Sequence, residues 1–202
     1  MKKYAFLLLA TFFSLCLFAQ EPKYFDVNHK EISKATFDEK RSTNTVLDIP
    51  GDSINHHKLI NREEKGKIND RTQLLSFLET ASNRKIDPAK PIVIIYYPCQ
   101  DTCNSTGNPQ FVIAANNTLK KDLQNQVKTV PLYVYKTDTG LDKFGKAINW
   151  IKDPEQIVEK HFFKHHYPCG SFVVISKSGD YISYFGEYAN SYLVEVAKKL
   201  NE

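Results

Sequence analysis

The side chains best suited to chemistry in this sequence are three cysteines, Cys99, Cys103 and Cys169. Three residues separate the first two, and both follow an apolar run that ends at residue 97. A thiolate is a nucleophile and a ligand for soft metals, so the spacing is compatible with disulfide exchange or with metal binding. In an oxidising compartment, the same cysteines can also serve only to cross-link the chain.

Residues 1–19 have the pattern of a secretory signal peptide and indicate that compartment. Lys2 and Lys3 form a basic start, residues 4–18 are mainly apolar, and Ala19 precedes a polar stretch. The apolar run is short for a membrane span of about twenty residues, and no basic stop signal follows it. We therefore expect a bacterial protein exported to the periplasm or secreted, with no stable membrane span after the signal is cleaved.

A fourth cysteine, Cys16, lies inside this predicted signal. Leu15 precedes it where a bacterial lipobox has a small residue, so lipidation is not expected. Removal of the signal leaves three cysteines, an odd number, so at least one is free, metal-bound or paired with another molecule.

Charge and composition narrow the class of partner. The 27 Lys and Arg residues outnumber the 23 Asp and Glu residues, and the lysines are spread among acids along the chain. A protein that binds nucleic acid normally has a concentrated basic stripe, so we expect no nucleic-acid partner. A chain of 202 residues with 42% hydrophobic content is long enough for one domain with a real core.

From residue 70 onward, helical and strand patterns alternate. Asp70 and Gln73 form a capping-box signature, and the apolar β-branched run at 91–97 is typical of a buried central strand. Residues 20–69 are expected to be a partly irregular extension with short strands near 45–49 and 58–60. The other expected elements are a helix at 109–123, a strand at 130–136, a helix at 153–163, a hairpin of strands at 172–176 and 181–185, and a final helix from 190.

This order of elements, together with the position of the cysteines after the first strand, resembles the thioredoxin fold over residues 70–202. The segment 172–186 is similar to the closing hairpin of that family. The resemblance implies an α/β protein with a mixed sheet of four to five strands and helices on both faces. It also implies that residues 167–171 form a loop that faces Cys99 and Cys103, with Pro168 as a candidate for the family's cis-proline.

The spacing of the cysteines departs from thioredoxins, which have two residues between them. A Cys-x-x-x-Cys motif with a central acid, here Asp101, is similar to Sco-type copper proteins, which bind copper through two thiolates and a distant histidine. In that interpretation the copper ligands would be Cys99, Cys103 and His165 or His166. The Tyr-Tyr-Pro lead-in at 96–98 is similar to peroxiredoxins, although Gln100 stands where they need a threonine.

The resemblance leaves three arrangements open for Cys169. Cys99 and Cys103 could form a redox disulfide with Cys169 as a third partner. Cys169 could form a structural disulfide with either of them, or all three could bind a soft metal such as Cu(I). Histidines near a helix end also commonly interact only with the helix dipole.

We expect thiol–disulfide exchange on exported proteins that carry thiols or disulfides, without a cofactor. In this hypothesis Cys99 attacks the substrate disulfide and Cys103 resolves the mixed disulfide, because the carboxyl end of a central strand is where chemistry collects in open α/β sheets. The alternatives are a Sco-like Cu(I)-binding protein and a non-catalytic interaction domain with a structural disulfide.

Overall fold

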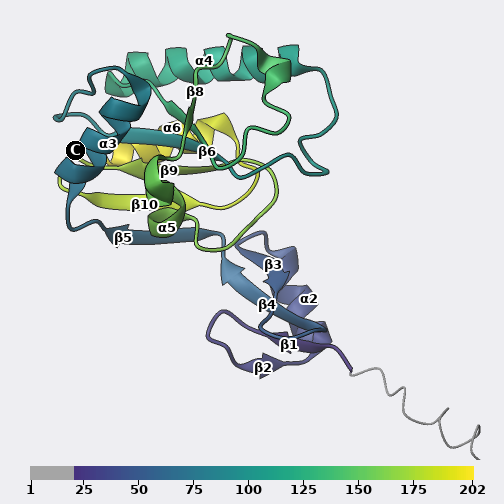
Figure 1. Ribbon diagram of the computed structural model, residues 1–202. Coiled ribbons are helices and arrows are strands. Elements are labelled where there is room, and N and C mark those ends of the chain that lie inside the picture. Colours follow the sequence, from purple (N-terminus) through teal and green to yellow (C-terminus); the bar gives the residue numbers. More distant parts are fainter. Residues whose placement is uncertain (1–20) are drawn as a thin grey trace, which may run out of the picture. The chain divides into compact units, whose positions relative to one another are not determined.

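The computed structural model describes residues 21–202, so the predicted signal peptide lies outside the described residues. The chain divides into two compact units, Met1–Ile60 and Asn61–Glu202 (Figure 1). The division falls before residue 70, where the sequence pattern had suggested a boundary, because residues 63–67 pair with the sheet of the second unit. Among the described residues, no helix combines the length and apolar character that a membrane crossing requires.

The described part of the first unit is a small four-stranded sheet with one helix. The sheet has the order β2-β1-β4-β3, and β1 and β2 form a hairpin with a short turn between them. The Asp26 carboxylate accepts the backbone N–H groups of Asn28 and Lys30 in this turn. The elements are β1 (Lys23–Phe25), β2 (Glu31–Ile32), α2 (Lys34–Ser42), β3 (Val46–Pro50) and β4 (His56–Asn61).

The second unit is built on a six-stranded mixed sheet in the order β5-β10-β9-β6-β7-β8. The central strand β6 runs parallel to β7 and antiparallel to β9, and β9 forms a hairpin with β10. The strands are β5 (Glu63–Lys67), β6 (Ile92–Tyr97), β7 (Leu132–Tyr135), β8 (Trp150–Lys152), β9 (Ser171–Ile175) and β10 (Asp180–Tyr184). The helices are α3 (Arg71–Ser82), α4 (Pro109–Val127), α5 (Ile157–Phe162) and α6 (Asn190–Lys199).

This arrangement confirms the thioredoxin-like fold. The unit β6-α4-β7, the β9-β10 hairpin and the final helix α6 follow one another as expected. The sheet has more strands than the four or five expected, because the edge strands β5 and β8 extend it on its two sides.

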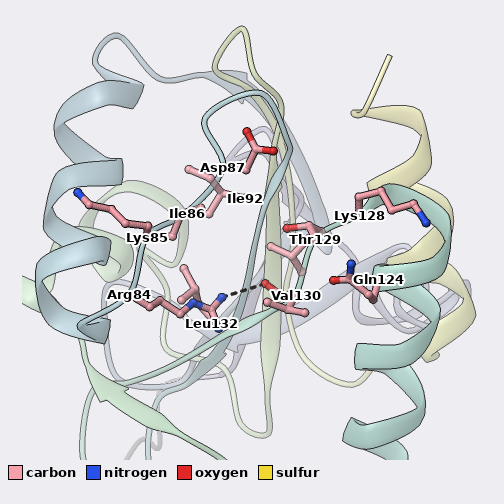
Figure 2. Close-up of a pocket in the computed structure, with 11 residues that line it drawn as sticks. Arg84, Lys85, Ile86, Asp87, Ile92, Gln124, Lys128, Thr129, Val130 and Leu132 are labelled. Atoms are coloured by element: carbon pink, nitrogen blue, oxygen red, sulfur yellow. Dashed lines mark hydrogen bonds between the residues drawn. The ribbon is translucent and has the colours of Figure 1, made fainter.

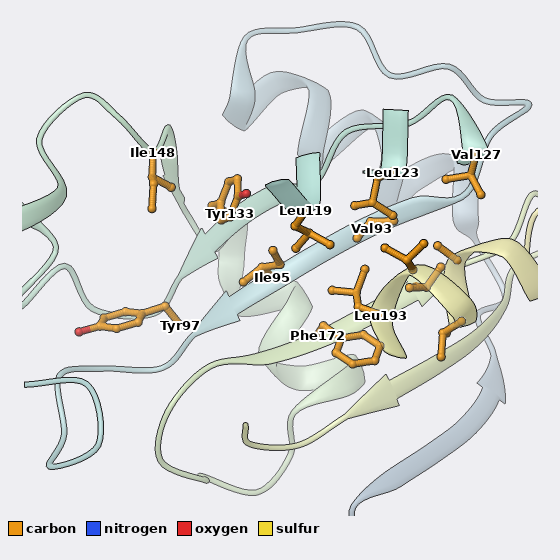
Figure 3. Packing of buried hydrophobic residues seen from close by; sticks show 14 of the residues in the cluster. Val93, Ile95, Tyr97, Leu119, Leu123, Val127, Tyr133, Ile148, Phe172 and Leu193 are labelled. Atoms are coloured by element: carbon orange, nitrogen blue, oxygen red, sulfur yellow. The ribbon is translucent and has the colours of Figure 1, made fainter. Parts of the chain in front are cut away.

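Helices cover both faces of this sheet. Alternate residues of β6 point to opposite faces, and on one face Val93 and Ile95 pack with residues of α4 and α6 such as Leu119 and Leu193 (Figure 3). On the other face the ring of Tyr96 stacks on Phe163, directly after α5, at 4.7 Å between centroids. All six residues of β6 are buried, which fixes the position of the loop that follows this strand.

Helix α5 is shorter than the pattern at 153–163 suggested. Glu155 and Gln156 have left-handed backbone angles. A short 3-10 turn therefore follows Asp153, and the α-helix begins only after it. Both carboxylate oxygens of buried Asp153 accept backbone N–H groups, those of Val158 and Glu159. These bonds tie the first turn of α5 to the segment that directly follows β8.

Candidate functional site

A disulfide joins Cys103 to Cys169, with 5.8 Å between their Cα atoms. Cys103 lies in the loop between β6 and α4, and Cys169 lies in the loop that leads into β9. Because β6 and β9 are antiparallel, with Tyr96 paired to Ser171, the end of one strand lies beside the start of the other. The sheet therefore brings together two loops that are 66 residues apart in sequence.

Cys99 is a free, half-buried thiol, so the expected Cys99–Cys103 pair is not formed. Of the arrangements that the sequence left open, the structure has the one that links Cys169 to Cys103. Helix α4 begins only at Pro109, so Cys99 does not lie at the helix N-terminus that would lower its pKa. Instead, burial raises the pKa of the Cys99 thiol, the negative charge of Asp101 raises it further, and Lys136 opposes both.

The loop that carries both cysteines is organised by Asn104. Its side-chain amide donates to the backbone carbonyl of Cys99 at 3.0 Å, and its side-chain oxygen accepts the backbone N–H of Asp101 at 3.0 Å. The ammonium group of Lys143 donates to the backbone carbonyl of Asn104. These bonds close a tight turn in which Cys103 is joined to Cys169 and Cys99 keeps a free thiol.

Asp101 contacts both halves of the disulfide. Its Oδ1 accepts the backbone N–H of Cys103 at 3.2 Å, and its Oδ2 accepts the backbone N–H of Cys169 at 2.8 Å. The same Oδ1 lies 2.6 Å from Cys103 Sγ. On the other sulfur, Glu187 Oε1 lies 3.7 Å from Cys169 Sγ. The disulfide thus has a carboxylate beside each sulfur.

Cys169 has a left-handed backbone conformation, with φ near 70°. A non-glycine residue adopts this conformation at a cost, and such residues often occur where a loop is held by specific contacts. Residues 21–202 contain no cis peptide bond, so Pro168 does not form the cis-proline that the thioredoxin resemblance suggested. The turn at Cys169, rather than a cis-proline, brings this loop to Cys103.

A cavity of about 250 Å³ adjoins the disulfide, and Cys103 forms part of its wall. It lies between the β6–α4 loop, the first turns of α4 and the segment around β8. Its walls are mainly apolar and include the aromatic residues Tyr97, Tyr133, Phe144, Trp150 and Tyr188. Burial raises the pKa of Tyr97 to about 12, so this hydroxyl keeps the proton that it donates to the Thr139 carbonyl.

The histidines of the copper hypothesis lie apart from the ligand group at the disulfide. His165 and His166 line a small depression together with Pro98. In the part of the chain that the structure describes, the one group of three or more residues whose potential ligand atoms all lie within 4.8 Å of one another is Asp101, Cys103 and Cys169. The two sulfurs would be available to a metal only after the disulfide is reduced.

A second cavity lies at the opposite end of β6, between the loop after α3 and the C-terminal end of α4 (Figure 2). Arg84, one of its lining residues, donates to the backbone carbonyl of Val130 at 3.2 Å. Ile92, at the start of β6, also lines it, whereas the cysteines follow the end of that strand. This cavity is therefore separate from the disulfide.

Sequence reasoning identified the three cysteines and Asp101, but it gave no role to Glu187 or to the aromatic cavity. Glu187 lies between β10 and α6, far from the cysteine motif in sequence. The local pattern around it carries no signal of a site. Only the position of α6 and the loop before it brings this carboxylate to Cys169.

The raised pKa of Cys99 predicts slow alkylation of this thiol in the oxidised protein. A higher pKa leaves a smaller thiolate fraction at neutral pH, and the thiolate is the reacting form. We expect iodoacetamide to modify Cys99 at pH 7 severalfold more slowly than an unperturbed cysteine peptide, and Lys136→Met to slow it further. Mass spectrometry over a pH series measures both, and a rate at or above that of the peptide would contradict the prediction.

No protein-family model matches the sequence, and no characterised protein matches it in a sequence search. Three solved thioredoxin-like structures resemble the chain in three dimensions. DsbF from MTB, described in mixed oxidised and reduced forms, has 13% identity and a TM-score of 0.41, and the match covers 55% of this chain and 81% of DsbF.

The pneumococcal exposed lipoprotein thioredoxin Etrx1 from Streptococcus pneumoniae has 14% identity and a TM-score of 0.41, over 61% of this chain and 90% of its own. BsSco is a member of the Sco family of cytochrome c oxidase assembly proteins and is described with a disulfide switch. It has 12% identity and a TM-score of 0.35, and the match covers 56% of this chain and 81% of BsSco. The assignment of the fold rests on the strand order and connections described above.

Proposed function

We propose that this chain is an exported thiol–disulfide exchange protein whose working pair is Cys103 and Cys169. The observation that carries this proposal is the position of the disulfide. It lies at the carboxyl end of the buried central strand β6, Cys103 is exposed, and an aromatic cavity reaches the same residue. A disulfide used only as a cross-link needs neither exposure nor an adjoining cavity.

The exchange reaction begins at Cys103, because its residue is exposed whereas Cys169 is half-buried. A substrate thiolate attacks Cys103 Sγ, the bond to Cys169 breaks, and Cys169 leaves as a thiolate that then takes up a proton. A second substrate thiolate attacks the substrate sulfur of the mixed disulfide, which releases the oxidised substrate and the Cys103 thiolate. The substrate loses two electrons and the protein gains them, and the reverse sequence reduces a substrate disulfide.

The proposed substrates are exported proteins that carry thiols or disulfides. The aromatic cavity beside Cys103 is suited to an apolar side chain close to the reacting cysteine of such a substrate, because burial of that side chain supplies binding free energy. Cys99 is not the attacking group of the resting protein in this proposal, because its thiol is half-buried and its pKa is raised.

A graded glutathione series with disulfide mapping by mass spectrometry tests the proposal. We expect the Cys103–Cys169 bond to open in one two-electron transition, at a potential between about −270 and −120 mV, the range of exchange proteins. The Cys99 thiol should stay unpaired throughout. A bond that resists reduction below about −300 mV would instead indicate a structural cross-link and contradict the proposal.

A further inference from the structure

We propose that Asp101 is a positioning residue that keeps Cys103 and Cys169 together when their disulfide is reduced, and so favours its re-formation. The inference rests on the proposed exchange function for its biological meaning. Its physical basis is that the carboxylate binds the backbone at both cysteines, so that its two bonds do not depend on the sulfur–sulfur bond.

The two hydrogen bonds of Asp101 connect separate loops. Oδ1 binds the N–H of Cys103 in the β6–α4 loop, and Oδ2 binds the N–H of Cys169 before β9, 68 residues away from Asp101. Hydrogen bonds to an ionised acceptor are stronger than those between neutral groups. Asp101 is itself held in place, since its own backbone N–H donates to the side chain of Asn104.

The bond to Cys169 also supports a backbone conformation that this residue would not favour alone. With φ near 70°, Cys169 is in the left-handed region, which is disfavoured for residues with a Cβ atom. In this conformation its N–H points at Asp101 Oδ2, at 2.8 Å. Loss of the carboxylate would free the loop to relax, and Cys169 would then sample positions farther from Cys103.

Closure of the disulfide depends on how often the two reduced sulfurs meet. In equilibrium with glutathione, two glutathione thiols reduce the disulfide to two protein thiols and leave as one glutathione disulfide, so electrons and protons balance. The equilibrium constant reflects the effective concentration of one protein thiol at the other. A side chain that holds both loops in the reduced protein raises that effective concentration.

The test compares Asp101→Ala, Asp101→Asn and Glu187→Gln in the glutathione equilibrium. We expect Asp101→Ala to shift the equilibrium towards the dithiol about tenfold, or about 30 mV for a two-electron couple. Asp101→Asn should give a smaller shift, because its amide oxygen can accept one of the two N–H groups and its NH₂ group cannot accept the other. Glu187→Gln removes a charge near Cys169 Sγ but no backbone bond, so it should change the equilibrium less than twofold.

Amide hydrogen exchange in the reduced protein gives a second readout. With Asp101 present, the N–H of Cys169 should remain protected after reduction, and in Asp101→Ala the protection should fall at least tenfold. Equal shifts for Asp101→Asn, Asp101→Ala and Glu187→Gln would show that charge alone acts, and an unprotected Cys169 amide in the reduced wild type would show that the bond does not persist. Either result overturns the inference. Neither measurement involves a protein substrate, so failure here is distinct from failure of the exchange function.

Discussion

Reduced Cys169→Ser protein, mixed with a disulfide-bonded protein substrate, is expected to accumulate a mixed disulfide on Cys103. Cys103 is the exposed member of the pair, and without Cys169 the bond that it forms lacks its intramolecular partner thiol. Steady-state exchange should fall at least about 100-fold in Cys169→Ser and in Cys103→Ser, since either change removes half of the covalent pathway. Non-reducing mass spectrometry of the trapped species measures the site of attachment.

Cys99→Ser is the matched control for this experiment. It removes a cysteine from the same loop, but one that is half-buried and outside the disulfide, so exchange should stay close to that of the wild type. A substrate attached to Cys99 would show that Cys99 is the nucleophile and contradict the proposal. A loss of exchange in Cys99→Ser as large as in Cys103→Ser would show the same. A trapped adduct on Cys169 in Cys103→Ser, as abundant as the one on Cys103, would contradict the order of attack.

Reduction of the disulfide is expected to lower the free energy of unfolding of the second unit by about 4 kcal/mol. The bond closes a loop of 66 residues, and the entropy of closing such a loop in the unfolded chain predicts a stabilisation of that size. For a unit of this length, the melting temperature should fall by roughly 10 °C. Trp150, the one tryptophan of the sequence, lies in this unit, so its fluorescence can follow the unfolding of that part of the chain.

The experiment compares the melting temperature of the oxidised protein with that of the protein in a non-thiol reductant, for the wild type and two variants. Cys99→Ser keeps the disulfide and should show the same decrease on reduction. The double variant Cys103→Ser/Cys169→Ser should melt near the reduced wild type and should not respond to the reductant. A wild type whose melting temperature is unchanged by reduction would show that the cross-link does not constrain the unfolded chain as expected.

The interior of the second unit was predictable from sequence because its elements carry strong patterns. The run at 91–97 is apolar and β-branched throughout, and it forms the fully buried strand β6. Asp70 caps α3 by accepting the N–H of Gln73, as the capping-box pattern indicated. In these segments local propensity and burial favour the same structure.

The edge elements were missed because tertiary pairing, not local pattern, defines them. Strand β5 has the sequence Glu-Glu-Lys-Gly-Lys, which has low strand propensity, and it is extended because β10 offers it backbone partners. Strand β8 is three residues long and exists by pairing with β7. Helix α2 buries only Phe37, so its apolar periodicity is too weak to recognise.

The sequence indicated the three cysteines but not which two of them pair. The sequence placed Cys99 and Cys103 after a central strand, and the structure confirms that position. The pairing of Cys103 with Cys169 is accompanied by a turn organised by Asn104 and by a hydrogen bond from the Cys169 N–H to Asp101. These contacts join loops distant in sequence, and spacing within one loop carries no information about them.

The position of the disulfide also decides which part of the fold is enclosed by a covalent ring. The segment between Cys103 and Cys169 contains α4, β7, β8 and α5, whereas β6, β9, β10 and α6 lie outside it. A single protease cut in the connection between β7 and β8 would therefore leave two fragments that stay linked while the disulfide is intact. After reduction, only strand pairing and core packing would hold those fragments together, so the redox state sets whether a covalent bond joins the two parts of a nicked molecule.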